Sequence, residues 1–227
     1  MCRSPTAPSG SKWSSPVSSI PRASARMVDA PTPTSPLAGQ THLPRANGPV
    51  GVTIAERVFA GMLVLRGNAI DPAFIAAAHG ALGFDLPLIA NTATSAGSNG
   101  ALWLGPDEWL VVTAPDDAMA RAVGLKVALV GLHAAVTDIG DSRTIIRLSG
   151  PKARDVLAKG CPLDLHPRTF GPGRAAQSLI ARAGVIIHQL DDIPSYDIYI
   201  LASFAAYLWN WLTDAGLEYG IVPGAKL

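Results

Sequence analysis

The chain has 227 residues, of which 48% are hydrophobic and only 15% are charged. Its 18 basic and 17 acidic residues give a formal net charge of +1, which argues against the strong electrostatic field of a nucleic-acid-binding or membrane-surface protein. Soluble domains usually carry about 25% charged residues. The low fraction here indicates either that a partner covers part of the surface or that the composition is biased toward alanine.

Cysteine content and apolar runs indicate where the protein works. Two cysteines, Cys2 and Cys161, cannot form a disulfide framework, so we expect a reduced, cytoplasmic compartment. No apolar run reaches the roughly 18 residues of a membrane helix. The N-terminus also lacks the apolar segment of about 7–15 residues that a secretory signal contains. We therefore predict neither a membrane contact nor a nucleic-acid partner.

Residues 1–50 contain nine of the 19 prolines and nine serines. They show neither helical nor strand periodicity, and such a segment buries too little apolar area to offset its ordering entropy. We predict a disordered tail. Its Ser- and Arg-rich start resembles a transit peptide weakly; an over-extended start, with Met27 as the true initiator, is the interpretation that we favour.

From Val52 onward, the pattern alternates between strands and helices. Asp71 and Pro72 are typical of an N-cap and a first helical residue, and Gly83 can end that helix. A loop rich in Gly, Ser, Asn and Thr is expected at 91–100. The first half is expected to contain, in chain order, the strand 62–66, the helix 72–82, the hairpin strands 101–104 and 108–113, the helix 116–130 and the strand 134–139.

The second half partly repeats this order. Its last helix is predicted to have Ser203 as N-cap and to end at Gly216. The earlier elements are the strand 144–148, the helix 151–159 and the strands 177–182, 185–190 and 196–201. Strand, helix, strand, strand, helix, strand is the order of a split βαβ, ferredoxin-like unit. We therefore predict an α+β fold of two such units, at 51–140 and 141–220, with a tail at 221–227.

Cys161 and His166 are the first candidates for nucleophilic catalysis. A reactive thiol needs a lowered pKa, from a helix N-terminus or a nearby cation. Cys161 instead follows the end of a helix, whose negative dipole would raise the thiol pKa. A buried structural cysteine is the favoured interpretation. Metal binding by Cys161, Asp164 and His166 is a weak alternative, because one Cys and one His without a second pair do not make a zinc site.

Three other polar segments are expected to have structural roles. His188 precedes two acids and could act as a base, but on an antiparallel strand we expect a surface or hydrogen-bonded interface residue. Asp138 and Asp141 could bind a cation, but Arg143 is expected to neutralise them. The glycine-containing loop 97–100 lacks the G-x-G-x-x-G pattern and the Walker lysine of a phosphate cradle.

Two tryptophan pairs could stack a pterin or a flavin. Trp209 and Trp211 are two apart on a helix and face different sides, so they cannot form one platform. We expect Trp209 to anchor a subunit interface. The full set expected at such an interface is Trp103, Trp109, His166 and Trp209.

Five segments carry a family resemblance in combination: 102–110, 138–144, 148–167, 196–199 and 203–212. The longest contains Ser149-Gly150-Pro151-Lys152 and Gly160-Cys161-Pro162-Leu163-Asp164-Leu165-His166-Pro167. Together they resemble the gamma subunit of heterotetrameric sarcosine oxidase. The resemblance covers about 55–220 of this chain and leaves the first 50 residues outside it.

The resemblance implies a fold related to the folate-binding aminomethyltransferase of the glycine cleavage system. It also implies a place in an alpha-beta-gamma-delta complex that demethylates sarcosine to glycine, forms peroxide and passes the methyl carbon to tetrahydrofolate. In that family the chain has no catalytic, cofactor-binding or metal site of its own. FAD, FMN, NAD and tetrahydrofolate are expected in the other subunits, and alpha is the expected main partner.

A second folate-related family is the alternative. Lys159-Gly160-Cys161 is similar to a motif of the folate-dependent iron–sulfur maintenance protein, a stand-alone folate-binding protein. Pro162-Leu163-Asp164 follows here in place of the aromatic, Gly, Gln and Glu residues of that motif. A stand-alone aminomethyltransferase is less favoured, because the chain is too short for its extra domains.

Overall fold

The computed structural model describes residues 33–40, 49–225 and 227, and the residues Thr34–Leu227 form one compact unit. Most of the tail predicted to be disordered lies outside the described residues. Within the part that is described, none of the helices has the length and apolar character needed to cross a bilayer.

The first half of the chain forms a five-stranded antiparallel sheet with two helices. Its strands are, in spatial order, β3 (Ala93–Ala96), β4 (Asn99–Gly105), β5 (Glu108–Thr113), β2 (Gly61–Gly67) and β6 (Ala134–Asp138). Helices α1 (Pro72–Leu82) and α2 (Ala118–Ala128) pack on one face of it. The order β4-β5-β2-β6 is that of a ferredoxin-like unit, with β3 added at the edge.

Local signals set the ends of α1 as predicted. The side chain of Asp71 accepts a hydrogen bond from the backbone N–H of Ala73 at 2.9 Å, which satisfies one donor of the first turn. Gly83 ends the helix with a φ of 77°, a left-handed conformation that glycine adopts without a Cβ penalty.

The second sheet has six strands. Their spatial order is β11 (Ile221–Pro223), β1 (Val52–Arg57), β7 (Arg143–Ser149), β10 (Ser195–Leu201), β9 (Ala183–Asp191) and β8 (Ala175–Ile180). All neighbours are antiparallel except β1 and β11. Helices α3 (Ala153–Ala158) and α4 (Ala202–Gly216) pack against one face. Strand β1 fills the place of the fourth ferredoxin strand, so this sheet draws on both ends of the folded chain.

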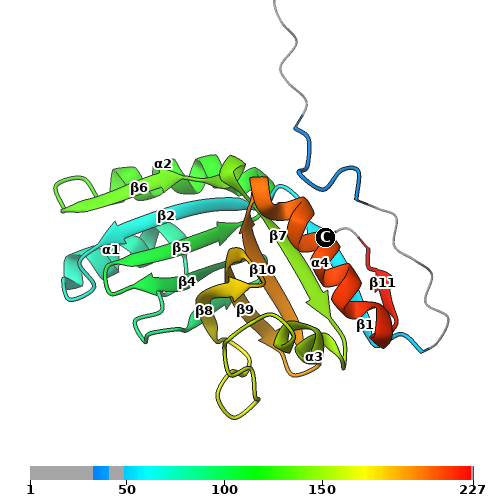
Figure 1. Ribbon diagram of the computed structural model, residues 1–227. Coiled ribbons are helices and arrows are strands. Elements are labelled where there is room, and N and C mark those ends of the chain that lie inside the picture. The colour runs from blue at the N-terminus through cyan, green and yellow to red at the C-terminus, as the bar shows by residue number, and fades with distance from the viewer. Residues whose placement is uncertain (1–32, 41–48, 226) are drawn as a thin grey trace, which may run out of the picture. The chain divides into compact units, whose positions relative to one another are not determined.

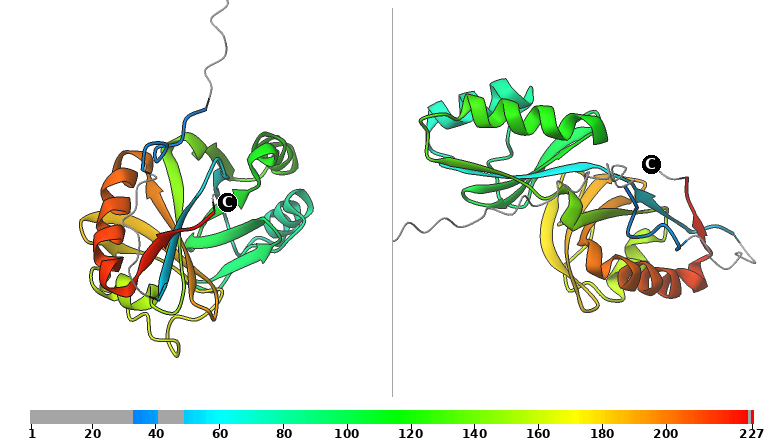
Figure 2. Two further views of the ribbon diagram at one scale, coloured as in Figure 1. Left: turned by 90° about the vertical axis from the view of Figure 1, so that its right-hand side faces the viewer. Right: turned by 90° about the horizontal axis from the view of Figure 1, so that it is seen from above.

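The two sheets face each other. The residues of β2 alternate: Leu63 and Leu65 face α1 and α2, whereas Met62 packs against Ile145 and Tyr199 of the other sheet. Figure 1 shows α1 and α2 beside the five-stranded sheet and α3 and α4 beside the six-stranded one, and Figure 2 shows the sheets between α2 and α4. The layer between the sheets is thus a third apolar core, and its margins are where polar groups from both sheets can meet.

Several details differ from the sequence-based expectations. Strand β3 lies within the predicted loop 91–100, and β11 lies within the predicted tail 221–227. Leu37 belongs to the segment predicted to be disordered, yet it is 3% exposed and packs in the core beside the second sheet. Helix α4 begins at Ala202 after Leu201, so Ser203 is inside the helix and is not its N-cap.

Three short 3-10 helices complete the described elements. They are η1 (Pro115–Asp117), η2 (Gly140–Ser142) and η3 (Leu217–Tyr219). The helix expected from residue 116 therefore starts as η1 and continues as α2.

Candidate functional site

A row of polar side chains crosses the six-stranded sheet on the face that is turned toward the other sheet. Strand pairing places Arg147 opposite Asp197, and Asp197 opposite His188. Tyr199, two residues further along β10, shares this face and packs in the core between the sheets. The polar row therefore lies at the margin of the apolar layer between the two sheets.

Asp197 is the centre of an ion-pair network. Its carboxylate is 1% exposed and accepts two hydrogen bonds from Arg147, from Nε at 2.7 Å and from Nη2 at 2.8 Å. Arg57 Nη1 lies 3.6 Å from the same carboxylate. Bidentate arginine–carboxylate pairs are among the stronger hydrogen-bonded contacts in proteins. The pairing raises the pKa of Arg147, chiefly through its hydrogen bond with Asp197.

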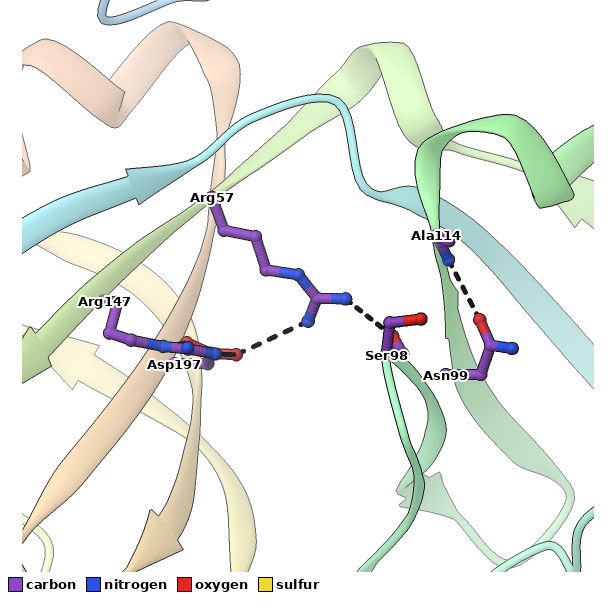
Figure 3. A network of polar contacts seen from close by, with 6 residues as sticks. All are labelled: Arg57, Ser98, Asn99, Ala114, Arg147 and Asp197. Atoms are coloured by element: carbon purple, nitrogen blue, oxygen red, sulfur yellow. Dashed lines mark hydrogen bonds and ion pairs between the residues drawn. The ribbon is translucent and has the colours of Figure 1, made fainter. Parts of the chain in front are cut away.

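Arg57 also links the two sheets. Its Nη2 donates a hydrogen bond to the carbonyl oxygen of Ser98 at 2.7 Å, in the turn between β3 and β4 (Figure 3). The neighbouring Asn99 accepts from the backbone N–H of Ala114 at 2.9 Å and so fixes the same turn. One guanidinium thus joins the buried carboxylate of one sheet to the edge of the other.

His188 was expected at the surface or at an interface, and that prediction is wrong. It is 4% exposed, and its Nδ1 has no hydrogen-bond partner among the residues that the structure describes. Burial, reinforced by the nearby arginines and opposed by Asp197, lowers the pKa of His188 to about 4. The imidazole is therefore neutral at pH 7.

A cavity of about 270 Å³ opens beside this network. Both sheets contribute to its lining. Polar groups come from the ion-pair residues and from the β3–β4 hairpin, and apolar walls come from the layer between the sheets. The lining includes Arg57, Ser98, Leu102, Val112, Arg147, His188 and Tyr199.

The predicted Cys161–His166 pair does not form a catalytic unit. Cys161 is a free, buried cysteine, as expected, and its Sγ lies 3.8 Å from the hydroxyl oxygen of Ser178. His166 is exposed, and its Nδ1 accepts a hydrogen bond from the backbone N–H of Arg168. The carboxylate of Asp164 accepts from the backbone of His166, which is the main cause of its lowered pKa. These contacts describe a structured turn.

The acids around residue 140 also form a turn. Asp138 accepts a hydrogen bond from the backbone N–H of Gly140 at 2.9 Å. Within the described chain, Arg143 makes no ion pair with Asp138 or Asp141, so the expected neutralisation does not occur. Burial alone lowers the pKa of Arg143. The described residues contain no group of three or more His, Cys, Asp or Glu side chains that could hold a metal ion.

The four residues expected at a subunit interface are placed very differently. Trp109 is fully buried, stacks on Phe74 with 5.7 Å between ring centroids, and donates its Nε1–H to the carbonyl of Pro87. Trp209 is 6% exposed and belongs to the core beside α3 and α4. Neither offers a surface to a partner. Trp103 is half-buried and His166 is exposed.

Sequence reasoning missed the ion-pair network because its members are far apart in the chain. A signal was present: Asp197 and Arg147 each stand between two apolar residues of a strand. A charge at a buried strand position requires a partner. Which residues pair across the sheet is decided by register, which the pattern of a single strand does not show.

Comparison with known proteins agrees with this fold. The profile of the sarcosine oxidase gamma subunit family matches residues 66–218. The chain is 37% identical over 175 residues to a sarcosine oxidase subunit gamma from Corynebacterium sp. strain P-1, covering 77% of this chain and 84% of that one. It is 34% identical over 191 residues to the subunit gamma of strain U-96, covering 83% and 90%.

Solved structures also match this chain. A chain of the heterotetrameric sarcosine oxidase from Corynebacterium sp. U-96, in complex with pyrrole 2-carboxylate, matches with a TM-score of 0.74 at 32% identity, covering 86% of this chain and 98% of that one. The glycine cleavage system aminomethyltransferase T from Bartonella henselae matches with a TM-score of 0.59 at 14% identity, covering 77% and 48%. The second match concerns the fold alone.

Proposed function

We propose that this chain is the non-catalytic assembly subunit of a heterotetrameric oxidase, because it belongs to the sarcosine oxidase gamma subunit family. The complex would comprise alpha, beta and delta subunits besides this one, with alpha as the main contact. It would demethylate sarcosine oxidatively to glycine, form peroxide and transfer the methyl carbon to tetrahydrofolate. FAD, FMN, NAD and tetrahydrofolate would be held by the other subunits.

One observation carries the proposal: the described fold covers 98% of a chain from a heterotetrameric sarcosine oxidase, with a TM-score of 0.74. A non-catalytic role is supported by the candidate nucleophile, because Cys161 is buried behind the end of α3 and has a serine hydroxyl as its polar neighbour. A free buried thiol also supports a reduced, cytoplasmic setting. The similarity to gamma subunits favours this function over a stand-alone folate-binding protein of the iron–sulfur maintenance type.

An exposed apolar stripe on α2 supports assembly with a partner subunit. Met119, Val123 and Val127 are spaced by four residues, and Val130 follows the helix. Their exposed fractions are 71%, 53%, 69% and 79%, respectively. Contiguous exposed apolar side chains usually mark an interaction site. We propose that another subunit of the complex covers this stripe, and we retain Trp103 and His166 as further interface residues.

Co-expression of the four subunits, with a tag on this chain, tests the assembly role. We expect three further subunits and a flavin spectrum to co-purify, whereas the isolated chain is colourless. A Val123→Asp, Val127→Asp double variant should fold, because both side chains are exposed, but should retain at least tenfold less of the other subunits. Ile193→Asp, at a lone exposed apolar residue of the β9–β10 turn, is the control. Normal assembly without this chain would refute the role.

Cys161→Ala tests the absence of chemistry in this chain. Turnover per assembled complex should stay within about twofold of the wild-type value, because the thiol contacts only structural neighbours. A loss of two orders of magnitude or more, with assembly intact, would return Cys161 to a catalytic role. Tetrahydrofolate binding by the isolated chain would favour the stand-alone folate protein.

A further inference from the structure

We infer that the cavity between the two sheets, bordered by Arg57, Arg147 and His188, is a binding site for a small organic monocarboxylate. Assembly with other subunits does not require this site. Three features of the cavity indicate such a ligand: its net positive charge, the unpaired imidazole nitrogen beside it, and its size and walls.

The charge balance at the cavity is positive. Two guanidinium groups, of Arg57 and Arg147, share the single carboxylate of Asp197. Since His188 is neutral at pH 7, these four groups have a net charge of +1. The side chains of Arg57 and Arg147 are only 18% and 27% exposed, respectively. A partly buried positive charge without a counter-ion is unfavourable, and an anion relieves it.

Among the described residues, Asp197 is the one acidic side chain that lines the cavity. Glu56 alternates to the opposite face of β1, where its carboxylate accepts hydrogen bonds from the hydroxyls of Ser35 and Thr144. The field of Asp191 reaches Arg147, and both residues border a second cavity, but Asp191 does not line the cavity that holds Arg57 and His188. Its carboxylate accepts from the backbone N–H groups of the β9–β10 turn. The positive charge of Arg57 is therefore available to a ligand.

His188 provides an independent indication of a ligand. A buried polar atom left without a hydrogen bond costs about 1–3 kcal/mol. Nδ1 of His188 is such an atom within the described structure, and His188 lines the cavity. Neighbouring protein atoms cover Nδ1, so the imidazole must turn before Nδ1–H can donate a hydrogen bond to an oxygen of a bound carboxylate. The orphaned nitrogen is thereby explained by the same ligand that balances the charge.

The size and walls of the cavity restrict the ligand further. A volume of about 270 Å³ is near the lower end of the ligand-pocket range, which begins at roughly 300 Å³. Leu102, Val112 and Tyr199 contribute apolar surface to the lining. A carboxylate with a short apolar or aromatic body matches both surfaces, whereas an inorganic anion would leave the apolar wall uncovered.

Calorimetric titration of the full wild-type chain at pH 7.5 tests the inference with benzoate and benzamide, which differ in charge but hardly in shape. Benzoate should bind at least tenfold more tightly than benzamide. Equal affinities would overturn the inference, and so would inorganic phosphate binding as tightly as benzoate, since the site would then recognise anions in general. This comparison needs no variant, so it does not depend on a substitution being tolerated.

Variants then locate the site. Arg57→Gln removes the unbalanced charge and should weaken benzoate binding at least tenfold, and His188→Gln should weaken it about fivefold. Arg66→Gln is the matched control, because Arg66 of β2 pairs at 2.8 Å with the exposed Asp107 in the β4–β5 turn and does not line this cavity. Wild-type affinity in a folded Arg57→Gln protein would overturn the assignment.

Discussion

Replacing Asp197 with Asn should destabilise the protein more than any conservative change at its surface. Asp197 is 1% exposed and accepts two hydrogen bonds from Arg147, with Arg57 3.6 Å away. Asparagine keeps the size but removes the charge and turns one acceptor into a donor that faces a guanidinium. Removing one partner of a buried ion pair costs about 3–5 kcal/mol. For a chain of this length, that corresponds to a melting temperature lower by roughly 6–20 °C.

Urea unfolding followed by circular dichroism measures this cost. The control is Asp107→Asn, which breaks an Arg66 pair of the same 2.8 Å length whose side chains are more than half exposed. Exposed pairs contribute about 0–1 kcal/mol. A double variant, Asp197→Leu with Arg147→Met, should recover part of the loss, because no unpaired charge remains at that pair. Equal costs for Asp197→Asn and Asp107→Asn would refute the assignment of Asp197 as the buried centre of the network.

Three further predictions concern pH, helix ends and the core. Burial lowers the pKa of His188 from 6.5 to about 4, so the unfolded chain binds this proton more readily. The contribution of neutral His188 to the stability of the fold is therefore fully present above about pH 6.5 and is lost as the pH falls toward 4. His188→Gln should reduce the fall in unfolding free energy between pH 7.5 and 5 by about 2 kcal/mol. An unchanged pH profile in this variant would contradict the prediction. In α1, Gly80→Ala should stabilise the protein by about 0.5–1 kcal/mol, because a Cβ at this position meets nothing within 4 Å. Gly83→Ala should instead destabilise it by about 1 kcal/mol, because Gly83 has a φ of +77°. Thermal melts in which both variants shift the melting temperature in the same direction would be inconsistent with the cap. Trp109→Phe removes the 2.8 Å hydrogen bond to the carbonyl of Pro87 and should cost about 1–3 kcal/mol, measured by urea unfolding, with no cost being the contrary outcome.

Elements with local signals could be predicted from the sequence. Asp71, Pro72 and Gly83 delimit α1 because capping depends on residues within one turn of each other. The hairpin of β4 and β5 and the order of the first ferredoxin-like unit follow from similarly short-range patterns. The edge strand β3 was missed, since its Ala, Thr and Ser residues lack the alternation of a half-buried strand.

The positions of single side chains could be predicted much less well from the sequence. Trp109 and Trp209 were expected at an interface, and both are in cores. Helical spacing correctly separates Trp209 from Trp211, but it does not tell which of the two faces the sheet. Which tryptophan faces the sheet depends on where α4 packs. In the structure Trp209 lies in the core, and Trp211 is partly buried at its edge.

Patterns along the chain predict the α+β class, the order of most elements, the caps of α1 and the family resemblance, because each depends on residues that are near one another in the sequence. Two features become visible in the folded chain alone: β1 and β11 join the second sheet, and four polar residues meet beside one cavity, namely Arg57, Arg147, Asp197 and His188. These residues are up to 140 positions apart in the sequence. Their proximity is a consequence of strand register and sheet packing, which are cooperative properties of the whole fold.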